Sequence, residues 1–171
     1  MAKIIYDRSS AADYARRWAL SRNPNYYDFE NIGGDCTNFA SQCIYAGCGI
    51  MNFTPDTGWF YSSLHNRSAA WTDVEYLYRF LVTNNSVGPY GIETDIALAE
   101  KGDIIQLGDK ERFYHSLVVT DRRRGVPLVC AHSFDEFDRP LHRYSAYRMR
   151  AVHIIGANDT VLSTPNSTEI I

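Results

Sequence analysis

Residues Gly33 to Gln42 read GGDCTNFASQ and place a cysteine between a glycine pair and a helix-like run. Gly33 and Gly34 allow the backbone to turn tightly. Asp35 is a residue type that is favoured at a helix N-cap. The stretch therefore predicts a helix that begins at Cys36, and Gly47 is suited to the position that follows its end.

Cys36 itself has two interpretations that the residues alone leave open. At a helix N-terminus, free N–H groups and the helix dipole favour a thiolate, and the Cys36 N–H could join an oxyanion hole. Alternatively, Cys36 shares a helical face with Phe39, Ala40 and Cys43 and packs in the core. Cys43 and Cys48 lack the Gly-Gly-Asp prefix, so we assign Cys43 to the core and Cys48 to the following loop.

The four cysteines of the chain, Cys36, Cys43, Cys48 and Cys130, include no CxxC pair. On one helix, Cys36 and Cys43 would lie two turns apart, about 10 Å, which is too far for a disulfide. We interpret all four as reduced thiols. A structural metal site built on Cys130 and His132 with distant partners is a less favoured alternative.

The composition is that of one soluble globular domain, which we take to span residues 1–171. The chain has 171 residues, of which 45% are hydrophobic and 22% charged. A formal net charge of −3 argues weakly against a nucleic-acid or anionic-membrane partner. The basic run Arg122-Arg123-Arg124 lies between two strand-like segments, and we interpret it as an exposed turn.

Both ends of the sequence carry expectations about localisation and order. MAKIIYDRSS contains no apolar core of a signal peptide, and no run of about 18 apolar residues is present, so we predict cytoplasmic synthesis without membrane insertion. Action outside the cell would then require release or export. Residues 157–171 are rich in Ser, Thr and Asn and predict a loosely ordered tail.

The first half of the chain has helical periodicity. Asp7 or Ser9 is expected to cap a first helix that runs to about Leu20. Thr72-Asp73-Val74-Glu75 resembles a capping box and predicts a third helix that ends at Asn84-Asn85. Residues 51–71, between the second and third helices, predict a long aromatic loop.

The second half predicts strands over residues 103–107, 113–120, 126–132 and 147–155. Helices followed by a meander of strands are typical of the α+β class rather than of βαβ units. We therefore expect an α+β fold with an antiparallel sheet.

His115 and His132 are the candidate partners for a cysteine nucleophile, which needs a base and a group that orients it. If the hairpin between their strands turned on Arg123-Arg124, the two histidines would lie opposite each other on one face. A slip of one residue would separate them. Asp135 is an alternative third residue, and Asp35 and Asn31 are candidates for oxyanion support.

Three segments together resemble the bacterial putative amidase domain family, within the papain-like group that includes the NlpC-type and CHAP cysteine hydrolases. They are GGDCTNFASQCIYAG around Cys36, KGDIIQL, and HSLVV from His115 onward. The resemblance implies a papain-like α+β fold with the catalytic helix on an antiparallel sheet. It also implies hydrolysis of an amide bond, typically in peptidoglycan, without metal or cofactor. Cys36 then matches the nucleophile and His115 the base, while His132 falls where related domains place a third polar group.

Three functions follow as hypotheses. The first is cleavage of peptidoglycan through a thioester, by an N-acetylmuramoyl-L-alanine amidase or a stem-peptide endopeptidase. This enzyme would act at the cell wall as a lysin or toxin, and an unidentified secretion-system, holin or immunity partner could accompany it. The second is a cysteine peptidase or deamidase of the same fold with a protein substrate. The third is a catalytically silent wall-binding module, against which the presence of both Cys36 and His115 argues.

Overall fold

The fold is α+β, as expected, in a computed structural model that describes residues 1–160. The helical elements are α1 (Arg8–Trp18), α2 (Cys36–Cys48), α3 (Ala69–Thr72), α4 (Val74–Thr83) and the 3-10 turns η1 (Ile96–Leu98) and η2 (Leu141–Arg143). The strands are β1 (Ala2–Ile5), β2 (Tyr61–Ser63), β3 (Asn66–Arg67), β4 (Gly88–Thr94), β5 (Ile104–Gly108), β6 (Phe113–Arg123), β7 (Val126–Ala131), β8 (Glu136–Pro140) and β9 (Arg148–Asp159). No described helix has the length and apolar character needed to cross a membrane.

The main sheet is antiparallel and is organised around β9. Its strand order is β1-β9-β5-β6-β7-β8, and β4 also pairs with β9. Three strands pair with β9. β5 pairs with its residues 148–152, β1 pairs with its residues 156–159, and β4 pairs with its residues 151–158. The last strand therefore joins three segments that are far apart in the sequence.

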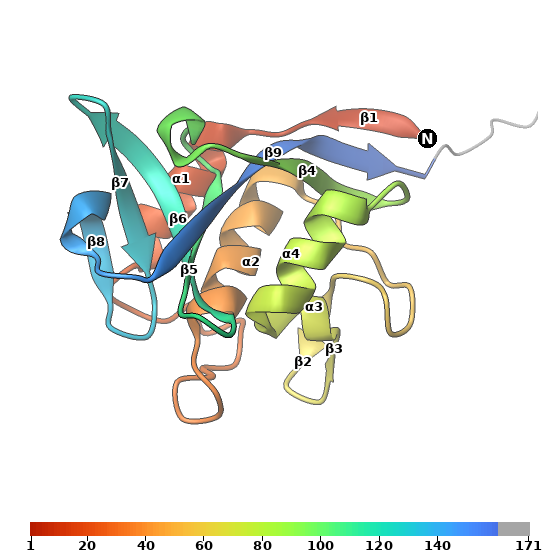
Figure 1. The fold of residues 1–171 in the computed structure, drawn as a ribbon. Helices are drawn as coiled ribbons and strands as arrows, with labels where there is room; N and C mark the ends of the chain where they lie inside the picture. The colour runs from red at the N-terminus through yellow and green to blue at the C-terminus, as the bar shows by residue number, and fades with distance from the viewer. Residues whose placement is uncertain (161–171) are drawn as a thin grey trace, which may run out of the picture.

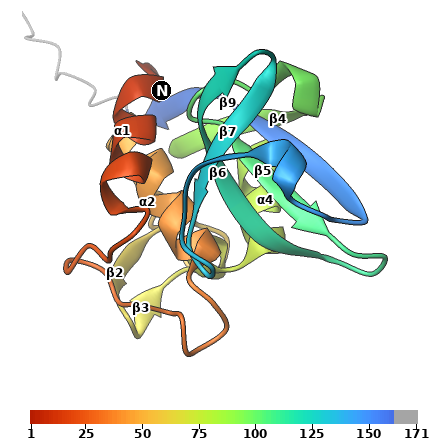
Figure 2. The same cartoon turned by 90° about the vertical axis from the view of Figure 1, so that its left-hand side faces the viewer.

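α2 is the central helix, and almost all of it is buried. Figure 1 shows it between α1 and α4, below β9 and β4. In Figure 2, α1 and α2 lie on one side and β5, β6 and β7 on the other. The alternation of β-strand side chains divides the core: Ile104 and Val118 pack with the helices, whereas Ile105 and Leu117 belong to a second cluster. Neighbouring residues of β6 therefore face opposite sides of the sheet: Val118 faces the helices, and Leu117 faces the second cluster.

The helix ends differ from the expected ones in three places. Asp7 caps α1 through the backbone N–H of Ser10, as predicted, but the helix ends at Trp18. α2 continues through Gly47 to Cys48 and ends at Gly49, whose φ of 69° is left-handed. Asp73, rather than Thr72, caps α4, because its carboxylate accepts from the N–H groups of Glu75 and Tyr76.

The hairpin between β6 and β7 corrects the predicted register. Its turn is formed by Arg124 and Gly125, which both have positive φ, so that Arg123 pairs with Val126. A shift between Val119 and Asp121 then makes Val118 the partner of Cys130. If the same register is extended beyond the Val118–Cys130 pair, His132 falls opposite Ser116 and not opposite His115. The predicted pairing of the two histidines is therefore wrong.

The strand at the C-terminal end is longer than expected. β9 runs to Asp159, which pairs with Ala2 of β1. Residues 157–159 therefore belong to the sheet and not to a tail, because β1 supplies hydrogen-bond partners from the other end of the chain. The remainder of the expected tail, residues 161–171, lies outside the described residues.

Candidate active site

Cys36 is the first residue of α2 and lines a cavity of about 300 Å³. Gly33 and Gly34, both with φ of 99°, form the turn that leads into the helix. The other walls of the cavity are Thr37, residues 72–76 at the start of α4, and residues 112–114 at the start of β6. The cysteine is only 7% exposed. A substrate carbonyl would therefore have to enter this cavity to meet the thiol.

The sulfur of Cys36 lies near polar groups of Thr37 and Ser116. The backbone N–H groups of Ser116 and Thr37 approach it, and the Thr37 hydroxyl lies 3.7 Å away. That hydroxyl also lies 3.1 Å from Ser116 Oγ, which ties α2 to β6. Burial nevertheless dominates and raises the pKa of the Cys36 thiol. The resting group is a neutral thiol, so the depressed pKa expected from the helix dipole is not found.

His115 lies next to Ser116 on β6, but its ring is not bonded to Cys36. It pairs with Leu107, a member of the second core cluster, and a register shift leaves Tyr114 as an extra residue. Tyr114 lines the Cys36 cavity, whereas His115 makes no side-chain hydrogen bond with the described residues. Burial lowers the pKa of His115 to about 4, so its imidazole is neutral near pH 7. A neutral ring is the form that can accept a proton.

His132 is buried among the helices and does not orient His115. Its Nδ1 lies 2.6 Å from Asp35 Oδ2, and its Nε2 lies 2.8 Å from the carbonyl oxygen of Trp18. The ring also stacks on Phe39, with 3.9 Å between centroids. Both hydrogen-bond partners are acceptor atoms, one on Asp35 and one on the backbone of Trp18. Its contacts therefore tie β7 to the start of α2.

Asp35 stands at the N-cap position but does not cap the helix. Its carboxylate instead accepts from the Phe29 N–H at 2.9 Å, from the Asn38 side chain at 2.8 Å and from His132. Asp35 is 1% exposed. The side chain thus fixes the loop that precedes Cys36 and does not line the cavity, whereas the sequence pattern suggested a helix cap and a candidate for oxyanion support.

Asn31 and Asp135, the two remaining candidates, lie away from the Cys36 cavity. Asn31 is exposed in the turn before Gly33 and is not among the residues that line the cavity. Asp135 accepts two hydrogen bonds from Arg22, each 3.0 Å long. The structure therefore does not bring either residue to Cys36 or to His115.

Cys130 and His132 do not share a metal-like site. The Cys130 sulfur contacts Asp138, whereas the His132 ring contacts Asp35. Within residues 1–160, no group of three or more His, Cys, Asp or Glu side chains is arranged to hold a metal ion.

The walls of the cavity contain residues that the sequence did not single out. Glu75 bonds the Phe113 N–H and pairs with Arg150 at 3.2 Å. Arg112 lines the same cavity, and its guanidinium has no hydrogen-bond or ion-pair partner among the described residues. Only the packing of α4 against the start of β6 reveals them, because nothing in the local sequence pattern links the two segments.

Comparisons with known proteins identify the family. The sequence model described as "putative amidase domain" matches residues 5–155. The uncharacterized protein YhbB of Bacillus subtilis (strain 168) is 33% identical over 138 residues, which are 76% of this chain and 42% of that protein. The chain thus spans less than half the length of this relative, and no solved structure is similar enough to be matched to it. The chain belongs to the putative amidase domain family.

Proposed function

We propose that this chain is a papain-like cysteine hydrolase that cleaves an amide bond of peptidoglycan with Cys36 as nucleophile. The observation that carries the proposal is the position of Cys36, the first residue of a buried helix, with its sulfur at a cavity and backbone N–H donors around it. Membership of an amidase family supports the reaction type. Peptidoglycan is the substrate that the family resemblance implies, and the enzyme would meet it at the cell wall after release or export.

The protonation states favour proton transfer during attack rather than a preformed ion pair. Burial raises the pKa of Cys36 and lowers that of His115, so the neutral pair is the resting state. As the sulfur attacks the substrate carbonyl carbon, His115 accepts the thiol proton. His115 pairs with Leu107 of the second core cluster and does not line the Cys36 cavity, so this step requires the start of β6, at the Tyr114 irregularity, to shift until the imidazole reaches the sulfur in the substrate complex.

The remaining steps follow from the chemistry of a thioester. The N–H of Cys36 makes no hydrogen bond with the described residues and can donate to the oxyanion, beside the N–H of Ser116. The C–N bond breaks, and His115 gives its proton to the leaving amine. Water then attacks the thioester, His115 takes the water proton, and the carboxylic acid and the free thiol are released.

The test is release of soluble fragments from purified sacculi, analysed by mass spectrometry to identify the broken bond. Cys36→Ala should abolish release, whereas Cys48→Ala should retain it. Cys48 is a suitable control because it lies at the other end of α2 and is similarly buried, at 6% exposed against 7% for Cys36. Absence of release by the unmodified protein across several wall chemotypes would refute the peptidoglycan proposal.

Two other outcomes would redirect the assignment. Hydrolysis of a protein amide that depends on Cys36, without attack on sacculi, would indicate a peptidase or deamidase. Binding to sacculi that survives Cys36→Ala, without any hydrolysis by the unmodified protein, would indicate a wall-binding module.

A further inference from the structure

A second cavity, of about 400 Å³, adjoins the Cys36 cavity across Tyr76. Tyr76 lines both cavities and is 48% exposed. Arg79, Phe80 and Thr83 follow it at helical spacing and also line the second cavity. One face of α4 therefore runs from the cavity that contains the thiol into the second one.

The frame of this second cavity is fixed by its own hydrogen bonds. The Asn52 side chain donates to Ser86 Oγ at 3.0 Å and to the carbonyl of Val87 at 2.8 Å. The Asn84 side chain donates to the carbonyls of Val87 and Pro89. These bonds hold the loop at residues 52–58 and the segment after α4 on two sides of the cavity. The cavity is thus part of the folded structure rather than a gap between loops.

Four polar side chains of the lining are free to bind a ligand. The side chains of Thr57, Asn85, Asp56 and Arg79 make no hydrogen bond or ion pair with the described residues. They offer a hydroxyl, an amide, one negative charge and one positive charge, with no excess of either sign. The Arg79 guanidinium lies 5.2 Å from the centre of the Tyr76 ring, which leaves the ring partly covered at one side.

We propose that this cavity binds the saccharide portion of an extended substrate whose amide bond lies at Cys36. Hydroxyl and acetamido groups of a sugar can exchange hydrogen bonds with the free Thr57 and Asn85 side chains. The exposed ring of Tyr76, between the two cavities, offers an electron-rich face to polarised sugar C–H groups. The balanced charge disfavours selection of a strongly anionic or cationic ligand. The saccharide assignment rests on the proposed peptidoglycan substrate.

A binding experiment tests the cavity without requiring catalysis. The Cys36→Ala protein is titrated with the N-acetylglucosamine tetramer by calorimetry, and the bound sugar is detected by saturation-transfer NMR. Asn85→Ala in the same background should weaken binding about 3- to 10-fold, as expected for loss of one hydrogen bond. Asn66→Ala is the matched control because Asn66 is exposed and lines neither cavity.

The outcomes separate this proposal from the proposed function. Absence of tetramer binding, or equal binding by the Asn85 and Asn66 variants, would overturn the saccharide site, even if sacculi are hydrolysed. Displacement by a sugar-free stem peptide that depends on Asn85 would make the cavity a peptide subsite and also overturn it. Asn85-dependent tetramer binding without hydrolysis of sacculi would support the saccharide site and refute only the proposed function.

Discussion

Asp35 Oδ2 lies 2.6 Å from His132 Nδ1, and both side chains are 1% exposed. This contact joins the residue before Cys36 to the end of β7, 97 positions further along the chain. A buried charged group that loses its partner keeps its desolvation cost without compensation. His132 therefore stabilises the N-terminus of α2, and it influences Cys36 indirectly, through its contact with Asp35.

Removal of either partner should destabilise the fold strongly. Asp35→Ala and His132→Ala are each expected to lower the free energy of unfolding by about 1–3 kcal/mol, because the other group stays buried and loses one of its hydrogen bonds. The double variant should cost less than the sum of the two. Urea denaturation near neutral pH measures all three.

The pair between Arg22 and Asp135, with side chains 26% and 34% exposed, is the more accessible comparison for this cycle, and Arg22 also lies 3.7 Å from Asp35. Asp135→Ala should cost at most about 1 kcal/mol. If His132→Ala instead kept its stability but lost turnover, His132 would act on catalysis directly, as the family resemblance suggested.

The reactivity of Cys36 should be that of a shielded thiol in the resting protein. Burial raises the pKa of Cys36, and it raises that of Cys48 to about 11. Near neutral pH we expect iodoacetamide to modify Cys36 more slowly than free cysteine. Cys36 should still react faster than Cys48, because its sulfur lies at a cavity with N–H donors. Mass spectrometry of proteolytic peptides gives both rates, and a Cys36 rate above that of free cysteine would reveal a resting thiolate.

Because His115 is buried, we expect the free energy of unfolding to decrease in acid. Burial lowers its pKa from 6.5 to about 4, and no neighbouring charge contributes to the shift. As the pH falls below 6.5, the unfolded chain binds this proton and the folded chain does not, so stability is lost until about pH 4. The expected loss is about 3 kcal/mol over that window.

The His115→Gln variant isolates this contribution because glutamine does not titrate. Its stability should fall less steeply than that of the unmodified protein between pH 6.5 and pH 4, as measured by urea denaturation. Parallel curves for the two proteins would mean that His115 is solvated in the folded state. The same variant should lose hydrolytic activity if His115 is the base.

Arg112 should contribute to substrate binding through its free guanidinium, which lines the Cys36 cavity. Guanidinium groups pair with carboxylates through two parallel hydrogen bonds. For a substrate that carries a carboxylate near the scissile amide, Arg112→Ala should raise KM by about 10- to 100-fold with little change in kcat.

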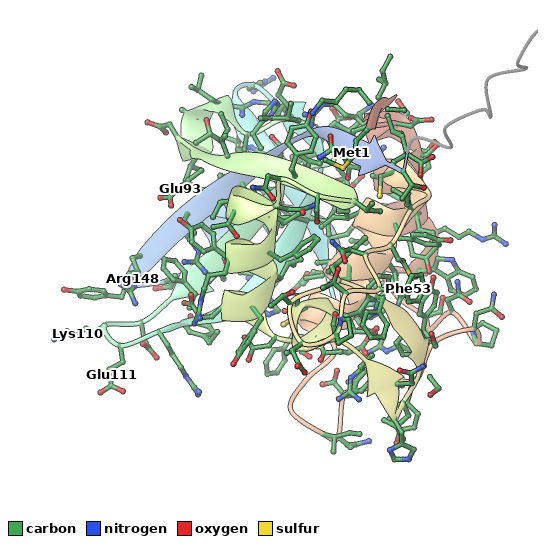
Figure 3. All side chains as sticks on the ribbon, turned by 90° about the vertical axis from the view of Figure 1, so that its right-hand side faces the viewer. Met1, Phe53, Glu93, Lys110, Glu111 and Arg148 are labelled. Atoms are coloured by element: carbon green, nitrogen blue, oxygen red, sulfur yellow. The ribbon has the colours of Figure 1, made fainter. Side chains whose placement is uncertain are left out.

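Lys110 is the control for Arg112, since Figure 3 shows it projecting away from the molecule, next to Glu111 between β5 and β6. Lys110→Ala has the same change in charge but removes a side chain that does not line the cavity. An equal effect of the two substitutions would indicate general electrostatic attraction instead of a specific contact.

The sequence predicted the elements whose signals are local. The start of α2 at Cys36 and the starts of β6 and β7 at Phe113 and Val126 are where the pattern set them. It missed β1, β4 and β8, which are short or rich in polar residues and exist because they pair with distant strands. It also missed the Asp35–His132 contact, because one residue of register between β6 and β7 decides which way His132 points.

The end of α2 offers a test of the same distinction between local pattern and packing. The sequence favoured Gly47 as the residue after the helix, yet Gly47 is helical and lies against Tyr6: an added Cβ would stand 2.3 Å from the ring carbon Cε2. Tyr6 cannot yield easily, because it is 5% exposed and its hydroxyl donates to the carbonyl of Gly102. Gly49 has nothing within 4 Å of an added Cβ, but its φ of 69° disfavours most side chains.

Asparagine can adopt the left-handed backbone conformation of Gly49, but its side chain does not fit beside Tyr6 at Gly47. Substitution by asparagine therefore distinguishes the two positions. Gly49→Asn should cost a few tenths of a kcal/mol (~0.5 kcal/mol). Gly47→Asn should cost about 1–3 kcal/mol or more, as overpacking of a buried contact does. Thermal denaturation of the two variants measures the difference. The opposite order would mean that α2 ends at Gly47 in solution, and it would move Cys48 out of the helix.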